Sequence, residues 1–319
     1  RHPDRATPGA RRIAVVGAGL AGLGAARALA GTGHEVVVFE KSRGLGGRLA
    51  TRRVEGAVLD HGCPVIEAPR DGPLAGEIAR LAHDDVVWLP DPGPGEIAVG
   101  FRSGQTRFAK ALADGIDVRR SVRVAALRRV AVGVEIADEQ GTGHGVAAAA
   151  ILTAPGPQAA ALLEASGEPE RAAMVAEAAY HAAVCVLTEV SGESEDPRPV
   201  IPGPSPLAAV SLEWRKRPGP HAVVARLDGP ASAALIDATD RDVLEVVLPI
   251  LDGMLGLRHT PWTQVKRWRY ALPAHALDAS LVAVGGSPII LAGDMFCGLD
   301  LEGVRRSGVD AARVAARTV

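Results

Sequence analysis

The sequence predicts an α/β fold in which a Rossmann-like dinucleotide-binding domain is combined with a second, α+β domain. Three observations favour it. A strand, glycine-punctuated helix and strand open the chain, the middle third alternates helical stretches with strand candidates, and the last 35 residues return to strand, turn and helix. A chain of 319 residues is long enough for about two domains and buries a sizeable core without disulfides.

The first third of the chain predicts a βαβ unit followed by irregular structure. Residues 12–16 are expected to form a strand, the chain turns helical through Ala25 to Ala30, and residues 35–39 form a second strand. A loop rich in Gly and Arg covers residues 41–53. Six prolines at residues 64 to 94 then exclude central strands from the region up to about residue 100.

The remaining elements follow from the same hydrophobic patterns. Helices are expected at residues 105–115, 157–165, 241–255 and 304–319. Strands are expected at residues 116–127, 130–139, 148–155, 181–190, 208–214, 222–228 and 288–293, the first two of them as a hairpin or meander.

This order predicts a discontinuous arrangement, with the first and last segments in one domain. We expect residues 11–62, 100–155 and 285–319 to form the dinucleotide-binding domain. Residues 63–99 and 156–284 would form the substrate domain. Residues 1–10, which are polar and start without Met, indicate a flexible, processed tail rather than a signal peptide.

Composition disfavours several classes of protein. With 35 Lys and Arg against 37 Asp and Glu, the net charge of -2 gives no electrostatic reason to expect nucleic acid or an anionic membrane as partner. The apolar run 13–30 contains four Gly and Arg27, so it is not expected to span a membrane. The three cysteines, which form no disulfide framework, favour a reducing compartment, and we expect a cytoplasmic location.

Motifs of other enzyme classes are absent from the sequence. It contains no HExxH, CxxC or GxSxG and no Walker A lysine, so metal, serine-hydrolase and NTPase chemistry have no support. We therefore expect no metal site.

Gly17, Gly19 and Gly22 form a GxGxxG turn between the first strand and the first helix, and Glu40 closes the next strand. In this context the first glycine permits a tight turn, the second lets backbone approach a pyrophosphate, and the third lets helix and strand pack closely. The amides of Leu20 and Ala21 lie at the helix N-terminus, which favours an anion. Glu40 would accept the ribose hydroxyls. The alternative is that the glycines only relieve crowding between helix and strand.

A second glycine-rich turn follows, with Gly44, Gly46 and Gly47 among arginines. The stretch from Glu40 to Thr51 resembles the ExxxxxGGRxxT motif of the two-dinucleotide-binding flavoproteins. The resemblance implies FAD, with Arg48 near the pyrophosphate or the flavin. The alternative is a solvated basic loop.

Further motifs resemble the renalase-type flavoproteins, a branch beside the flavin amine oxidases. They are EKSRGLGGRLATRR at 40–53, LDHG at 59–62, ILTAP at 151–155, KRWRYALP at 266–273 and LAGDMFCGLDLEGVRRSG at 291–308. The resemblance spans nearly the whole chain. It implies a Rossmann-like FAD domain made from separated segments and a substrate domain whose antiparallel sheet covers the flavin.

The resemblance also assigns cofactor-binding residues. Asp294 would bond a ribityl or phosphate group, the backbone of Gly62 would lie near the isoalloxazine, and Val124 would lie against the adenine. Lys41 and Gly303, which fall within the matching motifs, complete the cofactor-binding set.

The activity that the resemblance implies is oxidation of a dihydronicotinamide, a 2- or 6-dihydro isomer of NAD(P), by hydride transfer to flavin N5. Dioxygen would reoxidise the flavin and give hydrogen peroxide, so the partners are a small-molecule substrate and O2. One alternative is a flavin amine oxidase, which in relatives holds a neutral amine between two aromatic rings facing the flavin. Another is a flavin-binding protein with altered or lost activity.

Two segments depart from the family pattern. Bacterial members usually continue DHG with Ala-Gln and two aromatics, but this chain has Cys63, Pro64, Val65 and Ile66. Residues 227–237 also lack the aromatics that relatives carry there. With ten aromatics in total, two of them Tyr, the composition argues against an aromatic amine cage and for an aliphatic pocket.

The candidate catalytic residues are His61, Trp268 and Tyr270. His61 is either a proton carrier near the flavin or a structural residue bonding the FAD loop. Trp268 and Tyr270 either line the substrate site or pack within a strand. Lys266 either holds a water at flavin N5, as in amine oxidases, or is a surface lysine.

Cys63 and Cys297 both fall in motifs expected near the flavin. They could attach the flavin through a thioether, or they could be small apolar packing residues.

Overall fold

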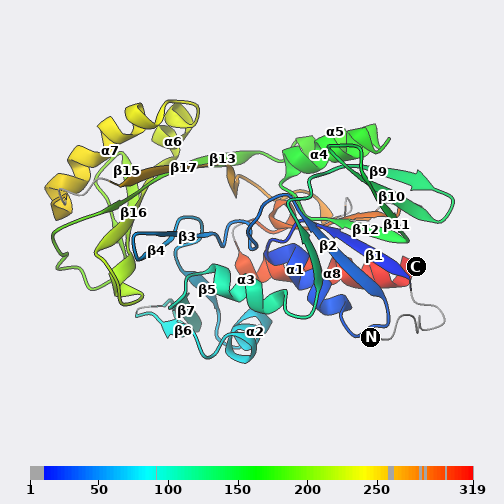
Figure 1. Cartoon of the computed structure of the whole chain (residues 1–319), viewed down its shortest axis with the longest axis horizontal. Helices are drawn as coiled ribbons and strands as arrows, with labels where there is room; N and C mark the ends of the chain where they lie inside the picture. The colour runs from blue at the N-terminus through cyan, green and yellow to red at the C-terminus, as the bar shows by residue number, and fades with distance from the viewer. Residues whose placement is uncertain are drawn as a thin grey trace. The chain divides into compact units, whose positions relative to one another are not determined.

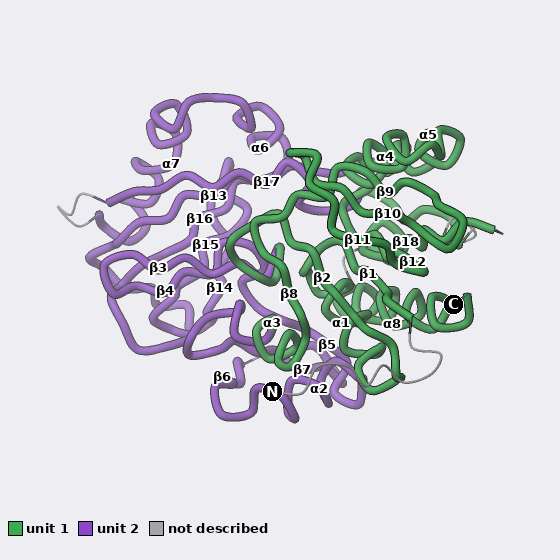
Figure 2. The backbone as a smooth tube through the Cα atoms, turned by 45° about the vertical axis from the view of Figure 1, so that its right-hand side comes forward, with its two compact units in different colours: residues 1–47, 109–179, 274–319 green, residues 48–108, 180–273 purple. Residues whose placement is uncertain are grey.

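The structure is a computed structural model that describes residues 11–90, 92–257, 262–279, 282–283, 286–298 and 300–318. The predicted tail, residues 1–10, lies outside the described residues. The chain divides into two units, each assembled from separate segments (Figure 2). Unit 1 comprises the described residues of 1–47, 109–179 and 274–319, and unit 2 those of 48–108 and 180–273.

The core of unit 1 is a five-stranded parallel sheet in the order β18-β12-β1-β2-β8 (Figure 2). Its strands are β1 (Arg12–Val16), β2 (Glu35–Glu40), β8 (Asp117–Arg120), β12 (Ala149–Leu152) and β18 (Ile289–Leu291). The strands β12 and β18 are buried along their whole length, and only the ends of β1 are partly exposed. Such apolar runs are typical of parallel strands covered on both faces. The predicted Rossmann-like α/β fold is confirmed.

Two helices that are far apart in the sequence pack together on this sheet. Helices α1 (Leu20–Leu29) and α8 (Leu301–Thr318) lie side by side and contact strands of the sheet (Figure 1). A Cβ added to Gly308 would lie 2.0 Å from the carbonyl oxygen of Ala21, so only glycine permits this approach of α8 to α1. The C-terminal segment is therefore an integral part of unit 1.

A three-stranded antiparallel sheet completes unit 1. Its strands are β9 (Val124–Val130), β10 (Gly133–Asp138) and β11 (Gly143–Ala147). β9 and β10 form the predicted hairpin. The single strand predicted over residues 116–127 is wrong, because Ser121, with φ at 58°, divides it into β8 of the parallel sheet and β9 of this sheet.

The main sheet of unit 2 is antiparallel, in the order β14-β15-β16-β13-β17. Its strands are β13 (Tyr180–Glu189), β14 (Val200–Pro202), β15 (Leu207–Leu212), β16 (Ala222–Leu227) and β17 (Thr263–Pro273). Two helices, α6 (Gly229–Leu235) and α7 (Asp240–Leu255), belong to the same unit. The antiparallel sheet expected in the second domain is confirmed.

Alternation along β13 divides its side chains between two cores. Val184 and Val186 pack with Val247 of α7, whereas Cys185 and Leu187 pack with Leu59. This is the period of two that a strand with both faces covered requires.

Two smaller sheets precede the main sheet in sequence. The hairpin β3 (Thr51–Val54) and β4 (Ala57–Asp60) is one, and the order β5-β7-β6 is the other. The second sheet contains β5 (Ile66–Pro69), β6 (Val86–Trp88) and β7 (Glu96–Phe101), with α2 (Pro73–Leu81) beside it. The prediction that no central strand occurs in this proline-rich region is wrong. β7 lies between the other two strands and contains no proline, because it begins after the last of the six prolines.

The unit boundaries differ from the predicted domain ranges. Residues 48–62 and 100–108 belong to unit 2, and residues 156–179 and 274–284 to unit 1. The reason is packing across long sequence distances. Helices α4 (Gly156–Ala165) and α5 (Pro169–Ala176) join unit 1 because the Leu127 amide donates to Ser166 and Arg171 donates to the carbonyl of Ile289. The unit boundary at residue 108 falls within α3 (Thr106–Leu112).

Helices long and apolar enough to cross a bilayer are absent from the described part of the chain.

Candidate functional site

The carboxyl edge of the parallel sheet carries most of the predicted cofactor-binding residues. Gly17 follows β1, Glu40 ends β2, and Asp294 begins the short 3-10 turn η3 (Asp294–Phe296) after β18. Val124 opens β9, a few residues after β8. Because neighbouring strands are parallel, these positions lie at one edge, where ligands bind in open α/β sheets.

The first glycine turn has the geometry expected of a phosphate-binding turn. Gly17 has φ at 108°, and its amide donates to the carbonyl of Phe39 at 2.8 Å. A Cβ on Gly22 would lie 1.9 Å from the Gly17 carbonyl oxygen, whereas a Cβ on Gly19 would meet no atom within 4 Å. The space beside Gly19 is therefore open, next to the first-turn amides of Leu20 and Ala21, which have no partner within the helix.

Glu40 joins this turn to the next one. Its side chain is buried, one oxygen accepts the Ala18 amide at 2.9 Å, and the other accepts the Ser42 amide at 2.8 Å. Each carboxylate oxygen has a second lone pair, so each can still accept a hydroxyl.

The second glycine turn lies directly beside the first. The Gly46 amide donates to the Ala18 carbonyl at 2.8 Å, and a Cβ on Gly47 would lie 3.6 Å from Gly19 Cα. The Lys41 ammonium, which is exposed, donates to Gln158 of α4 at 2.9 Å.

Arg48 belongs to unit 2, where its guanidinium donates to the Ala271 carbonyl of β17 at 2.9 Å.

Asp294 and Gly303 lie in the segment between β18 and α8. Asp294 is buried, and its carbonyl accepts the amides of Cys297 and Gly298. Gly303 is in the first turn of α8, where a Cβ would lie 3.0 Å from that of Cys297. Of the cofactor-binding residues that the sequence predicted, all but Arg48 and Gly62 therefore lie in unit 1.

The three candidate catalytic residues lie in unit 2, within two pairs of rings. His61 stacks on Trp268 with ring centroids 5.4 Å apart and planes 22° apart. Tyr270 instead meets Tyr180 of β13 edge to face, at 5.7 Å and 75°. The register between β13 and β17 shifts between Trp268 and Leu272, and such irregularities re-aim side chains.

The surroundings of His61 keep its imidazole neutral. Burial, then the positive charge of Lys266, lowers the pKa of His61 to about 4, although the Asp60 carboxylate opposes this. Its Nδ1 is buried and has no hydrogen-bond partner among the described residues. The Trp268 indole N–H donates to the His61 carbonyl at 2.8 Å, so the ring pair is also tied through the backbone.

Gly62 lies tightly against Arg48. A Cβ on Gly62 would lie 2.0 Å from the Arg48 carbonyl oxygen, which also accepts the Cys63 amide at 2.8 Å.

The two cysteines of the predicted flavin motifs are in different units. Burial raises the pKa of the Cys63 thiol to about 12, and the thiol donates to the Val65 carbonyl. The Cys297 thiol donates to the Gly293 carbonyl.

Sequence reasoning missed a buried group of charges next to His61. Asp60, Glu213, Lys216 and Arg217 are each at most 5% exposed, and each cation contacts both carboxylates. The sequence contained a signal for this group. Asp60 stands in the apolar context of LDHG, where a buried carboxylate requires a cation, and the run EWRKR at 213–217 offers three.

A parallel sheet with two adjacent glycine turns and a buried acid at its carboxyl edge defines a dinucleotide-binding flavoprotein. A model of the NAD(P)-binding Rossmann-like domain matches residues 15–80, and a model of the flavin-containing amine oxidoreductases matches residues 77–316. The chain belongs to the family of flavin-containing amine oxidoreductases. This family consists of flavin-containing oxidoreductases, and membership implies FAD as the cofactor.

Curated relatives match only part of their own length. A Mycobacterium tuberculosis protein, "Putative flavin-containing monoamine oxidase AofH", is 35% identical over 130 residues, which are 39% of this chain and 27% of the relative. A 4,4'-diapophytoene desaturase of Staphylococcus aureus is 43% identical over 58 residues, 18% of this chain and 12% of the relative. The chain thus spans about a quarter or less of these relatives.

Solved structures match the whole fold at low identity. A "Putative protoporphyrinogen oxidase" from Exiguobacterium has a TM-score of 0.76 at 15% identity, over 95% of this chain and 98% of that one. An oxidoreductase from Methanosarcina mazei has a TM-score of 0.68 at 15% identity, over 95% and 100%. At this identity the likeness shows the fold alone.

The residues of unit 1 fit FAD. The open space beside Gly19 accepts a pyrophosphate at the N-terminus of α1. The free lone pairs of the buried Glu40 carboxylate suit two ribose hydroxyls.

Proposed function

We propose that the chain is a renalase-like oxidase that oxidises a dihydronicotinamide, a 2- or 6-dihydro isomer of NAD(P), in a cytoplasmic setting. FAD, held by the glycine turns and Glu40, would supply the hydride acceptor, with dioxygen and a proton as the final acceptors that give hydrogen peroxide. Such chemistry asks the protein mainly to orient the donor and exclude water, and needs no catalytic dyad.

In this proposal the residues of unit 1 bind the cofactor and those of unit 2 form the donor site. The glycine turns and Glu40 hold the pyrophosphate and the adenosine ribose, while Val124, Lys41, Asp294 and Gly303 complete the cofactor contacts. In unit 2, His61, Trp268 and Tyr270 line the donor site, and the resemblance of the sequence motifs assigns Arg48 and the backbone of Gly62 to cofactor binding. A neutral His61 orients the donor through a hydrogen bond and does not act as a strong acid at neutral pH.

One observation favours a dihydronicotinamide over an amine as the hydride donor. Tyr180 and Tyr270, the two tyrosines of the chain, pack edge to face at 5.7 Å. Rings in such contact leave no slot between them for an amine. His61 and Trp268 instead stack nearly parallel, and a dihydronicotinamide ring can extend this stack on an outer ring face.

Anaerobic rapid mixing tests this proposal. The 2- and 6-dihydro isomers of NAD(P) should bleach the visible flavin absorption, and Trp268→Ala should slow the bleaching at least about tenfold by removing the stacking partner. Trp88→Ala, which changes an exposed tryptophan on β6, is the matched control and should bleach at the wild-type rate. Unchanged absorbance at saturating donor, in protein whose flavin dithionite reduces, would sink the idea.

An amine oxidase is the second candidate, favoured by the family and by the monoamine oxidase relative. A polyamine or an aromatic amine that reduces the flavin faster than any dihydronicotinamide would reverse our ranking. If neither kind of donor reduces it, the third reading applies, a flavin-binding protein with altered or lost activity in which residues 63–66 depart from the family pattern.

A further inference from the structure

The segment from Asp60 to Pro64, which contains His61 and Gly62, is held at both ends by the same two residues. The backbone amide of Gln105 donates to Asp60 Oδ1 at 2.9 Å, and the side-chain nitrogen of Gln105 donates to the Pro64 carbonyl at 3.2 Å. The Lys216 ammonium donates to Asp60 Oδ2 at 3.2 Å and to the same Pro64 carbonyl at 3.0 Å. Each residue therefore closes a bridge across the whole segment.

These bridges are formed by buried groups whose charges balance. Gln105 is fully buried, and Lys216 and Asp60 are each 1% exposed. Glu213 accepts from Lys216 at 2.9 Å and from Arg217 at 3.0 Å, and Arg217 also bonds Asp60. Two cations thus face two carboxylates, so removing one partner would leave a buried charge uncompensated.

Stability alone does not account for ionic groups here. Well-packed apolar side chains of similar volume are often as stabilising as a buried ion pair, or more so. Directional bonds differ from apolar packing in that they fix atoms at defined points. In this segment the fixed points are the two ends of the turn that presents His61.

The middle of the segment follows its ends. Gly62 has no room to move toward Arg48, and the His61 amide donates to the Ala50 carbonyl at 3.2 Å. The orientation of the His61 ring on Trp268 therefore depends on where Asp60 and Pro64 are held.

We propose that Lys216 and Gln105 are positioning residues of this enzyme, which clamp the Asp60–Pro64 segment and thereby fix the His61 ring and the Gly62 backbone. The proposal rests on the proposed function only in assigning His61 to the donor site. Neither Lys216 nor Gln105 touches the reacting atoms in this proposal. Both act through the segment that they hold.

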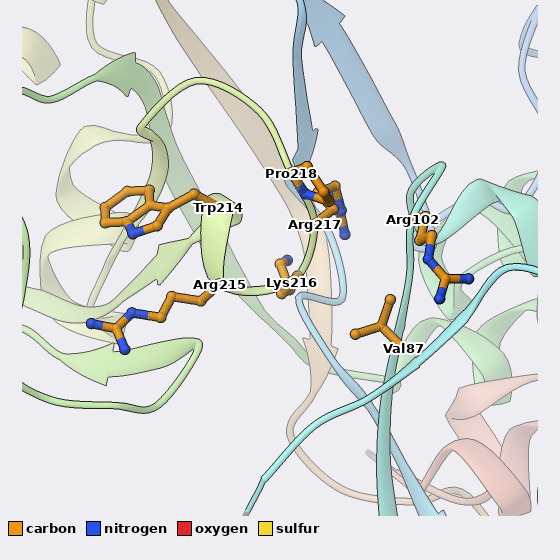
Figure 3. Close-up of a pocket in the computed structure, with 7 residues that line it drawn as sticks. All are labelled: Val87, Arg102, Trp214, Arg215, Lys216, Arg217 and Pro218. Carbon is orange, nitrogen blue, oxygen red and sulfur yellow. The ribbon is translucent and has the colours of Figure 1, made fainter.

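The neighbouring Arg215 provides a matched control. Lys216 and Arg215 both line a cavity of about 340 Å³, together with Val87, Arg102, Trp214, Arg217 and Pro218 (Figure 3). Figure 3 shows the Arg215 side chain directed away from that of Lys216, and its guanidinium donates to the carbonyls of Ser194 and Pro197. Arg215→Met therefore changes a cation of the same run without changing the clamp.

Two variants loosen the clamp in different ways. The pair Glu213→Gln and Lys216→Met removes one negative and one positive charge, so Asp60 keeps Arg217 as its partner and the net charge near His61 is unchanged. Gln105→Leu removes a tether to Pro64 without removing any charge. If the paired variant fails to fold, Gln105→Leu carries the test by itself.

The first measurement is the pKa of His61, read by NMR in histidine-labelled full-length holoenzyme and assigned with His61→Gln. Burial has the largest effect on this pKa, followed by the charges of Lys266, Asp60 and Arg52, and both variants leave these three residues in place. In the variants the pKa should rise from about 4 by about one unit or more toward its ordinary value, because a released ring is better hydrated. Arg215→Met should titrate like the wild type.

The second measurement separates positioning from stability. In folded, flavin-loaded variants kcat for dihydronicotinamide oxidation should fall about 10- to 100-fold while KM changes by less than about threefold. Arg215→Met should keep both constants. An unchanged His61 pKa together with unchanged kcat in both clamp variants would overturn the proposal.

Failure of the proposed function is a separate result. If no dihydronicotinamide reduces the wild-type flavin, that function fails, but the His61 titration needs no turnover and still decides the clamp. An unchanged titration in both folded variants then refutes the clamp, and a raised pKa supports it.

Discussion

At the scale of single residues, Glu40 has the most consequential position in unit 1. Its two oxygens accept amides from the two glycine turns, so one carboxylate fixes the relative position of both. The sequence identified this residue as a ribose ligand from its distance to the GxGxxG turn alone. Its second role, as the link between turns, follows only from the fold.

Replacing Glu40 should therefore weaken FAD binding. In Glu40→Gln the side-chain amide cannot accept from both Ala18 and Ser42, and a charge-assisted hydrogen bond is worth about 1.5–3 kcal/mol. We expect FAD affinity to fall about 10- to 100-fold, measured by calorimetric titration of the flavin-free protein. Glu35→Gln, at the exposed start of the same strand, should bind FAD like the wild type. Equal affinity in both variants would remove Glu40 from the cofactor site.

His61 should make stability depend on pH in the acid range. Its pKa is about 4 in the folded protein against an ordinary value of 6.5, so between these values the unfolded chain binds a proton that the folded chain does not. The free energy of unfolding therefore contains a contribution of up to about 3 kcal/mol that is complete above pH 6.5 and is lost as the pH falls toward 4.

Urea unfolding from about pH 7 to about pH 4.5 measures this effect. As the pH falls, the wild type should lose unfolding free energy relative to His61→Gln, which has no group that titrates at this position. His181→Gln, which changes an exposed histidine on β13, is the control and should follow the wild type. A constant difference across the range would contradict the buried, neutral His61.

At the scale of elements, the strands with apolar runs were predictable and the breaks between them were less so. β1, β2, β12 and β18 each contain an uninterrupted apolar run, which is typical of buried parallel strands. The end of β8 was missed because residues 116–127 have one unbroken strand-like pattern, and the turn at Ser121 is dictated by pairing with two different sheets. The number of prolines also led to a wrong prediction, since β7 follows the last proline of its region and contains none.

Helix α7 offers a test at this scale. Thr239 caps it: its hydroxyl accepts the Asp242 amide, and the Asp242 carboxylate accepts the Thr239 amide. Thr239→Ala should lower the free energy of unfolding of unit 2 by about 0.5–2 kcal/mol, because the Asp242 amide loses its acceptor at the start of the helix. Thr239→Ser keeps the hydroxyl and should stay close to the wild type in the same urea titration. A full-size loss in the serine variant would mean that the methyl group, not the cap, matters.

At the scale of the whole molecule, the division into units depends on contacts that no local pattern reveals. α4 and α5 follow directly after the parallel strand β12, yet their composition resembles that of the middle third. They belong to unit 1 because the Leu127 amide donates a hydrogen bond to the Ser166 hydroxyl and the Arg171 guanidinium donates one to the Ile289 carbonyl of β18. Similarly, β4 joins unit 2 through the packing of Leu59 on Leu187.

The bound cofactor should be removable and should stabilise the molecule. Acid precipitation should leave a yellow supernatant, because the Cys63 thiol, with its pKa raised to about 12, is a poor nucleophile for attachment. Adding FAD back at about 100 times its Kd should stabilise the protein by about 2.7 kcal/mol and raise Tm by about 5–10 °C. FMN, which lacks the adenosine ribose, should not. Flavin that stays in the precipitate would indicate covalent attachment, and a colourless preparation would contradict FAD as cofactor.

The sequence by itself determined the fold class and the cofactor. Those depend on short-range patterns, because a glycine turn and its acid are set by residues within one βαβ unit. Only the tertiary structure decided that Gln105 and Lys216 meet at the Asp60–Pro64 segment, and that the two tyrosines meet each other. These partners are about 40 to 160 residues apart in sequence, and a buried charge specifies that it needs a partner without specifying where in the chain the partner lies.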